Sequence, residues 1–167
     1  MALMAAAAPM VAALALLPVA PAQAAAGDLS CKSALTLNLT PPLKAGGTSN
    51  AAISGNLSNC SSSNGQHSDL ASGTLSGTGS MTATAAADDP CGLALTGTGT
   101  AAIAWASGSK STFDLKFSPD LSLTATVTDG ALKGDVITVT MDGAQPNPGC
   151  ATDGLSSLAV QGSMAFA

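Results

Sequence analysis

The sequence of 167 residues contains no tyrosine, no arginine and no glutamate, and it has only one histidine and one tryptophan. All ten acidic residues are aspartates and all five basic residues are lysines, which leaves a net charge of −5. Proteins that bind nucleic acids or anionic membrane surfaces use clusters of arginine and lysine. The sequence therefore predicts neither a nucleic acid nor an anionic membrane surface as a partner.

The scarcity of histidine and aromatic residues restricts the enzymes that this chain could form. Any histidine-based hydrolase would have to use His67, which lies in the polar stretch Gly65-Gln-His-Ser-Asp69, typical of a solvated loop. Asp88 and Asp89 are adjacent carboxylates, but they precede Pro90 as in a turn, and a glycosidase would also need aromatic platforms for sugars. We predict that the chain is not an enzyme, with a hydrolase using His67 or an aspartate pair as the alternative.

The sequence carries no recognisable site for a metal or cofactor. It has neither G-x-S-x-G nor H-E-x-x-H, and there is no second histidine for a metal centre. The pairs Asp129-Gly130, Asp142-Gly143 and Asp153-Gly154 lack the spacing of a calcium loop and are typical of hairpin turns. We predict no cofactor and no resident metal; adventitious calcium is the alternative at these three turns.

Residues 1–26 have the composition of a secretory leader. They carry no charge, are rich in alanine and leucine, and end in the A-x-A sequence Ala22-Gln-Ala24. We expect cleavage after Ala24 or after Ala26, and a single mature domain over residues 27–167. An uncleaved anchor helix is the alternative, but three prolines interrupt the segment. The expected location is the medium or the cell envelope, with no transmembrane anchor after cleavage.

Four cysteines follow the leader, namely Cys31, Cys60, Cys91 and Cys150. In an exported chain an even number predicts two disulfides, and the spacings match no zinc motif. Three pairings are possible from sequence. If the first two strands form a hairpin, Cys31 opens one strand and Cys60 closes the other, so we favour Cys31–Cys60 and Cys91–Cys150.

Alternation of apolar and polar residues recurs along the whole mature chain and predicts an all-β protein. The alternating runs cover residues 35–39, 53–57, 70–85, 93–105, 113–117, 121–127, 137–141 and 158–166. Each strand has one apolar face that must be hidden, and the last strand reaches far enough to pair with the first. We predict an antiparallel barrel of about eight strands, closed or nearly closed, with a β-sandwich as the runner-up.

Trp105 ends the run Ala94-Leu-Thr-Gly-Thr-Gly-Thr-Ala-Ala-Ile-Ala-Trp105 and raises the question of a binding site. Strict alternation places it on the same face as Leu95 and Ile103, which is the face that the strand must bury. We therefore interpret Trp105 as a core residue whose indole N–H meets a main-chain carbonyl, with a ligand platform as the alternative. The glycines of this face should allow a close approach or sharp coiling of the strand.

A barrel with small side chains inside could also hold a small apolar ligand. This hypothesis makes the protein a carrier, and it is the alternative to a binding or structural role of the folded domain itself. A membrane-spanning barrel is disfavoured because no girdle of aromatic residues is present.

Several phrases occur together in a fixed order along the mature chain. Cys31 and its strand lead to Pro42-Leu43 and then to Gly55-Asn-Leu-Ser-Asn-Cys60; Gly97-Thr-Gly99 leads to Ile103-Ala-Trp105-Ala-Ser-Gly108-Ser-Lys-Ser111; and Cys150-Ala-Thr-Asp-Gly-Leu155 leads to Gly162-Ser-Met-Ala-Phe166. In this order the chain resembles a group of small secreted actinobacterial proteins of uncharacterised function. The resemblance implies an exported, disulfide-bonded β-barrel or sandwich and no catalytic residues. We expect an exported, non-catalytic domain that acts by binding or as a structural component of the envelope or medium.

Overall fold

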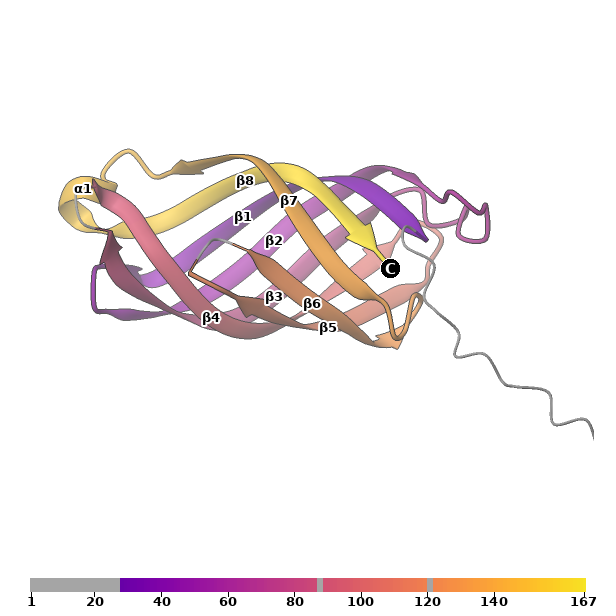
Figure 1. The fold of residues 1–167 in the computed structure, drawn as a ribbon, viewed down its shortest axis with the longest axis horizontal. Helices are drawn as coiled ribbons and strands as arrows, with labels where there is room; N and C mark the ends of the chain where they lie inside the picture. Colours follow the sequence, from indigo (N-terminus) through magenta and orange to yellow (C-terminus); the bar gives the residue numbers. More distant parts are fainter. Residues whose placement is uncertain (1–27, 87–88, 120–121) are drawn as a thin grey trace, which may run out of the picture.

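A computed structural model describes residues 28–86, 89–119 and 122–167 of the chain. Eight antiparallel strands follow one another around a closed barrel in chain order (Figure 1). The predicted all-β barrel is therefore confirmed, and the β-sandwich offered as runner-up is wrong. The predicted leader, residues 1–26, and its cleavage positions lie outside the described residues.

The strands differ in length by more than a factor of two. The elements are β1 (Leu29–Leu43), β2 (Thr48–Ser61), β3 (Gly73–Ala86), β4 (Asp89–Trp105), β5 (Lys110–Phe117), β6 (Leu123–Gly130), β7 (Val136–Pro146), the short helix α1 (Cys150–Asp153) and β8 (Leu155–Phe166). β4 has 17 residues, whereas β5 and β6 have 8 each, so the barrel wall is not equally tall all the way round. No helix within the described ranges is long and apolar enough to cross a membrane.

Pairing of β1 with β8 closes the barrel. The register runs from Leu29 opposite Phe166 to Asn38 opposite Ser157, and it shifts before the last pair, Leu43 opposite Leu155. On its other side β1 pairs with β2 over almost its whole length. Both edges of the first strand are thus hydrogen-bonded to a neighbouring strand.

The structure corrects the predicted turn at Asp88-Asp89-Pro90. Asp88 lies outside the described residues, and β4 already begins at Asp89 and includes Pro90. A strand can start with proline because its first residues need not donate to a neighbour.

Two of the three Asp-Gly pairs are not hairpin turns. Asp142-Gly143 lies within β7, where the register against β8 shifts between Met141 and Gly143 as in a β-bulge. Asp153-Gly154 ends the helix α1. Asp129-Gly130 does end a strand, since β6 stops at Gly130 and a turn follows.

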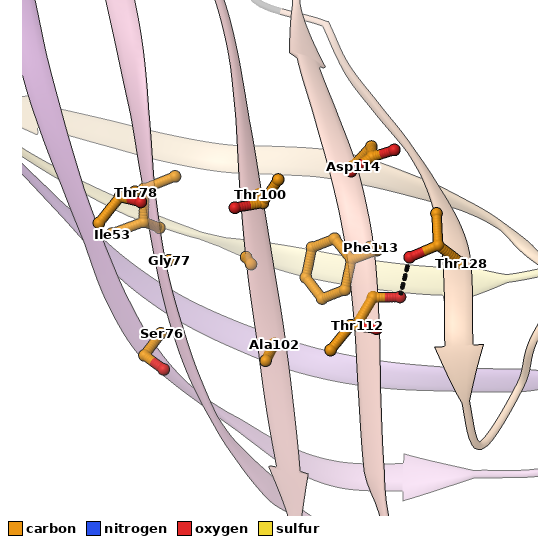
Figure 2. A pocket seen from close by; sticks show the side chains of 11 residues that line it. Ile53, Ser76, Gly77, Thr78, Thr100, Ala102, Thr112, Phe113, Asp114 and Thr128 are labelled. Atoms are coloured by element: carbon orange, nitrogen blue, oxygen red, sulfur yellow. Dashed lines mark hydrogen bonds between the residues drawn. The ribbon is translucent and has the colours of Figure 1, made fainter.

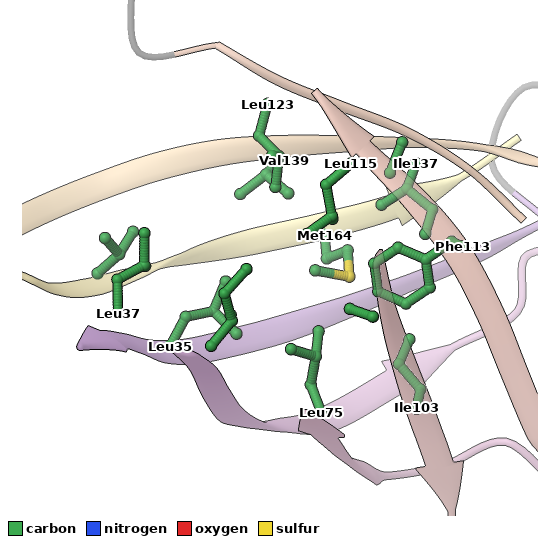
Figure 3. Packing of buried hydrophobic residues seen from close by; sticks show 14 of the residues in the cluster. Leu35, Leu37, Leu75, Ile103, Phe113, Leu115, Leu123, Ile137, Val139 and Met164 are labelled. Atoms are coloured by element: carbon green, nitrogen blue, oxygen red, sulfur yellow. The ribbon is translucent and has the colours of Figure 1, made fainter. Parts of the chain in front are cut away.

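The interior is filled by one continuous cluster of buried side chains drawn from every strand (Figure 3). Those labelled in the figure are Leu35, Leu37, Leu75, Ile103, Phe113, Leu115, Leu123, Ile137, Val139 and Met164. They occupy every second position of their strands, while the residues between them face outward. The period-two pattern read from the sequence is therefore the pattern of burial.

The glycines of β3 and β4 leave no room for a side chain between the two strands. Gly79 is directly opposite Gly99, and a Cβ built on Gly99 would lie 2.5 Å from the carbonyl oxygen of Thr78 and 2.9 Å from the Cα of Gly79. Both contacts are with main-chain atoms, which cannot swing aside. The predicted role of these glycines in a close approach is thus confirmed.

We predict that Gly99→Ala lowers the free energy of unfolding by about 1–3 kcal/mol, because the added methyl group overpacks the β3–β4 wall. The matched control is Gly143→Ala, where a Cβ would meet no atom within 4 Å. The control should change stability by no more than about 0.5 kcal/mol. Denaturant unfolding of both variants measures the difference, and equal effects would contradict the steric explanation.

Candidate functional site

Both predicted disulfides are present. Cys31 is bonded to Cys60 within the β1–β2 hairpin, as the hairpin argument predicted. Cys91 of β4 is bonded to Cys150, the first residue of α1, with their Cα atoms 5.7 Å apart. Two disulfides are typical of chains that fold in an oxidising, extracellular-type environment.

Trp105 is a core residue, as predicted, and is only 3% exposed. Its ring packs against Phe166 at a centroid distance of 5.9 Å with the planes tilted by 59°, close to the edge-to-face arrangement that aromatic rings favour. Trp105 ends β4, and Phe166 ends β8, so this pair joins two strands that are far apart in sequence. The ring is enclosed and offers no surface to a ligand.

The indole N–H of Trp105 has a different partner from the predicted main-chain carbonyl. Nε1 donates to Oγ of Ser111, at 2.9 Å, and Ser111 Oγ in turn donates to the carbonyl oxygen of Ala131, at 2.6 Å. Ser111 is fully buried, so its hydroxyl relays the hydrogen bond from the ring to the main chain of the β6–β7 turn. The sequence could not reveal this relay because it depends on the register between β4, β5 and that turn.

His67, the one histidine, lies half-buried in the loop between β2 and β3. Its main-chain N–H donates to Ser62 Oγ at 3.4 Å, and its carbonyl oxygen accepts from Leu70 N–H at 3.0 Å. Within the described part of the chain, its imidazole has no hydrogen bond to a serine hydroxyl or a carboxylate. Asp69, its neighbour in sequence, is exposed. The loop thus brings together no triad around His67.

Asp135 is a partly buried carboxyl whose surroundings shift its pKa. It lies in the β6–β7 turn, and its Oδ2 atom is buried without a hydrogen-bond partner in the described residues. Burial raises the pKa of the Asp135 carboxyl above its usual value, the negative charge of Asp28 raises it further, and His67 lowers it. Asn64 Nδ2 donates to Asp28 Oδ1 at 2.9 Å, so Asp28 is already engaged. Sequence patterns gave no sign of this cluster, because its members come from three separate segments.

The other sequence candidates form no catalytic arrangement. Asp88 lies outside the described residues. The candidate carboxylate pair of Asp88 and Asp89 therefore also lies outside them. No group of three or more histidine, cysteine or acidic side chains in residues 28–86, 89–119 and 122–167 is placed to hold a metal ion. The described side chains therefore suggest neither a hydrolytic centre nor a metal centre.

The outer wall over β3, β4 and β5 carries small hydroxyl side chains in facing rows. Cross-strand neighbours there are Thr82 and Thr96, Ser80 and Thr98, and Thr78 and Thr100. A hollow of about 480 Å³ opens on this wall, rimmed by threonines and the carboxylate of Asp114 and backed by the buried Phe113 (Figure 2). Thr128 Oγ1 donates to the carbonyl oxygen of Thr112 at 3.2 Å across its edge. The hollow offers polar contacts but no activated nucleophile.

We predict that Ser111→Ala lowers the free energy of unfolding by about 1–3 kcal/mol, because it leaves the indole N–H of Trp105 and the carbonyl of Ala131 buried without partners. The control is Ser107→Ala in the exposed β4–β5 turn, which should change stability by about 0.5 kcal/mol or less. Tryptophan fluorescence during denaturant unfolding follows both variants. Equal stability of the two would show that the relay contributes nothing.

We predict that Asp135→Asn stabilises the protein at pH 7 and not at about pH 3. A carboxyl whose pKa is raised by folding destabilises the folded state once it ionises, so its cost is absent below the unfolded value of about 3.9 and is fully present above the folded value. Thermal unfolding at both pH values measures this. The control Asp69→Asn removes the same charge from an exposed site, and a gain at pH 7 shared by both variants would refute the burial argument.

Comparison with known proteins identifies no relative. No family model, no curated protein and no solved structure matches this chain. The function must therefore be argued from the residues and geometry of this chain.

Proposed function

We propose that this chain is an exported, disulfide-bonded β-barrel that acts as a non-catalytic binding or structural component of the cell envelope or the medium. The observation that carries the proposal is the division between a filled interior and a hydroxyl-rich outer wall. The leader-like residues 1–26, the two disulfides and the resemblance to small secreted actinobacterial proteins support the export of the chain.

The packing inside the barrel favours a role for the outer surface over the carriage of a ligand. The widest side chains, Trp105, Phe113 and Phe166, lie inside and are each at most 3% exposed. A carrier would need an interior space lined by side chains that a ligand could contact. The hollow over β3, β4 and β5 instead opens on the outside of the barrel, where threonine and serine side chains line it.

The arrangement of the ionisable groups favours a non-catalytic role over a hydrolase. A hydrolytic mechanism through His67 would need a nucleophile and an orienting acid within hydrogen-bond reach. In the described part of the chain, the hydrogen bonds of His67 are main-chain contacts to Ser62 and Leu70 that shape the loop, and its interaction with Asp135 is electrostatic. The raised pKa of the Asp135 carboxyl is explained by its burial and by the charge of Asp28, so it does not require a catalytic role.

We predict that the full chain, expressed in a secreting bacterial host, reaches the medium without residues 1–26 or 1–24 and with both disulfides formed. Intact-mass measurement should show the loss of the leader and of two hydrogen atoms for each disulfide. Native mass spectrometry of the same material should show no bound small molecule. The control is the quadruple variant with alanine at all four cysteines, whose mass lacks the hydrogen loss.

Two outcomes would overturn this proposal. Material that keeps residues 1–26 and stays with the cells would contradict export. A stoichiometric small molecule that leaves only on unfolding would replace the proposed role with that of a carrier.

A further inference from the structure

The hairpin of β5 and β6 ends halfway along the barrel, and beyond its end no described residue pairs with the side of β4 that faces away from β3 (Figure 1). β5 stops at Phe117, opposite Gly97 of β4, and Ser118 N–H donates to the carbonyl of Ser122 at 3.0 Å to close the hairpin. β4 continues beyond Gly97 in the direction of Asp89. Among the described residues, positions 93–96 of β4 pair with β3 alone. We call the outer side of this segment the free β4 edge.

The register shows which main-chain groups line the free β4 edge. Trp105 N–H donates to Ser109 O, and Gly108 N–H donates to Trp105 O, so the main chain of Trp105 faces β5. In an antiparallel strand this direction alternates with every residue, and the register with β3 is regular back to Leu93. The N–H and C=O groups of Leu93 and Leu95 therefore point away from β3, along the free β4 edge.

The opposite side of the interval, formed by β7, is unsuited to pairing. The register of β7 shifts at a bulge between Met141 and Gly143, and Pro146 lacks an N–H group. Bulges and prolines are the features with which proteins protect exposed strand edges from pairing. Residues 93–96 of β4 contain neither. Of the two strands that border the interval, β4 therefore has the regular edge over residues 93–96 and β7 does not.

The interval beside the free β4 edge is bounded by the β5–β6 hairpin at one end and by a disulfide at the other. At the hairpin end, two strands lie between β4 and β7, whereas further along the Cα atoms of Cys91 and Cys150 are 5.7 Å apart, little more than the distance of about 4.7–4.9 Å between paired strands. The chain thus bounds this interval on both sides and at its far end.

We propose that the free β4 edge, residues 93–96, binds an extended segment of another polypeptide by β-strand addition. The proposal rests on the binding role proposed above and names the class of partner. Main-chain donors and acceptors in strand register are matched by the main chain of another strand. The side chains of the added strand would alternate between the two faces of the wall, which favours alternating apolar and polar residues. The net charge of −5 favours a segment that carries lysine.

The test uses the folded, disulfide-bonded protein and a short synthetic peptide that alternates valine and threonine between terminal lysines. Amide hydrogen exchange measured by NMR should slow at Leu93 and Leu95 by about tenfold or more at saturating peptide, because each amide gains a hydrogen bond. The amides of Ala94 and Thr96, which face β3, serve as internal controls and should not change. Absence of slowing at Leu93 and Leu95 would overturn the proposal.

A matched peptide separates strand addition from charge and hydrophobic attraction. The same peptide, N-methylated at alternate residues on its pairing side, keeps its side chains and charge and cannot donate to the edge. Its dissociation constant should be higher by about tenfold or more, because the loss of one or two hydrogen bonds corresponds to such a change. Equal binding of the two peptides would refute strand addition, as would slowing confined to residues 142–146.

Two variants test the edge from the side of the protein. Leu93→Pro removes one donor from the free β4 edge without removing a pair with β3, and it should weaken peptide binding. Val136→Thr, at a large apolar side chain that is 47% exposed, should leave binding unchanged. If the proline variant does not fold, the peptide pair alone decides.

The intact-mass and hydrogen-exchange measurements on the same protein distinguish a failure of strand addition from a failure of the proposed function. A bound small molecule or retained leader in the intact-mass experiment would overturn the exported binding role, whatever the exchange data show. Unchanged exchange at Leu93 and Leu95 in correctly exported protein would overturn only the edge as its site. Self-association of the protein without peptide, with slowing at the same two amides, would assign the edge to a second copy and contradict the proposal.

Discussion

The pairing of β1 with β8 is the interaction on which the rest of the fold depends. Until Leu29 meets Phe166, the apolar faces of eight strands lie on an open sheet with two unsatisfied edges. Once the sheet closes, the apolar faces of all eight strands point into the barrel. The cluster that fills the interior, and the burial of Trp105 against Phe166 in particular, is therefore a consequence of closure. Closure also turns every second residue outward, which creates the hydroxyl-rich wall.

The unequal lengths of the strands determine which side chains fill each half of the barrel. Where all eight strands are present, the interior holds the aromatic rings of Trp105, Phe113 and Phe166. Past the end of the β5–β6 hairpin only six strands remain, and there the interior is filled by leucine, alanine and methionine, with Ala83 and Leu95 among them. The aromatic rings are thus confined to the half of the barrel in which all eight strands are present.

The local alternation of apolar and polar residues was sufficient to predict most of the fold. Features that depend on contacts between strands distant in sequence could not be predicted from it. Alternation identified the strands, and the hairpin argument paired Cys31 with Cys60, because both depend on residues close in sequence. The bulge at Asp142-Gly143 and the relay through Ser111 depend on the register between strands, which no local pattern contains. For the same reason the sequence did not reveal the buried carboxyl of Asp135, whose surroundings come from distant segments.

The two disulfides stabilise the barrel in different ways. Cys31–Cys60 joins strands that are already hydrogen-bonded neighbours, so it reinforces an existing ladder. Cys91–Cys150 spans 59 residues and joins β4 to α1 on the side where the hairpin has ended, and the chain-entropy model assigns such a loop about 4 kcal/mol. It holds the wall together where main-chain pairing is missing. On this side of the barrel no described strand pairs with the outer edge of residues 93–96, so the main chain of Leu93 and Leu95 is directed away from β3. The side of the barrel that this bridge joins is therefore also the side best suited to receive a partner strand.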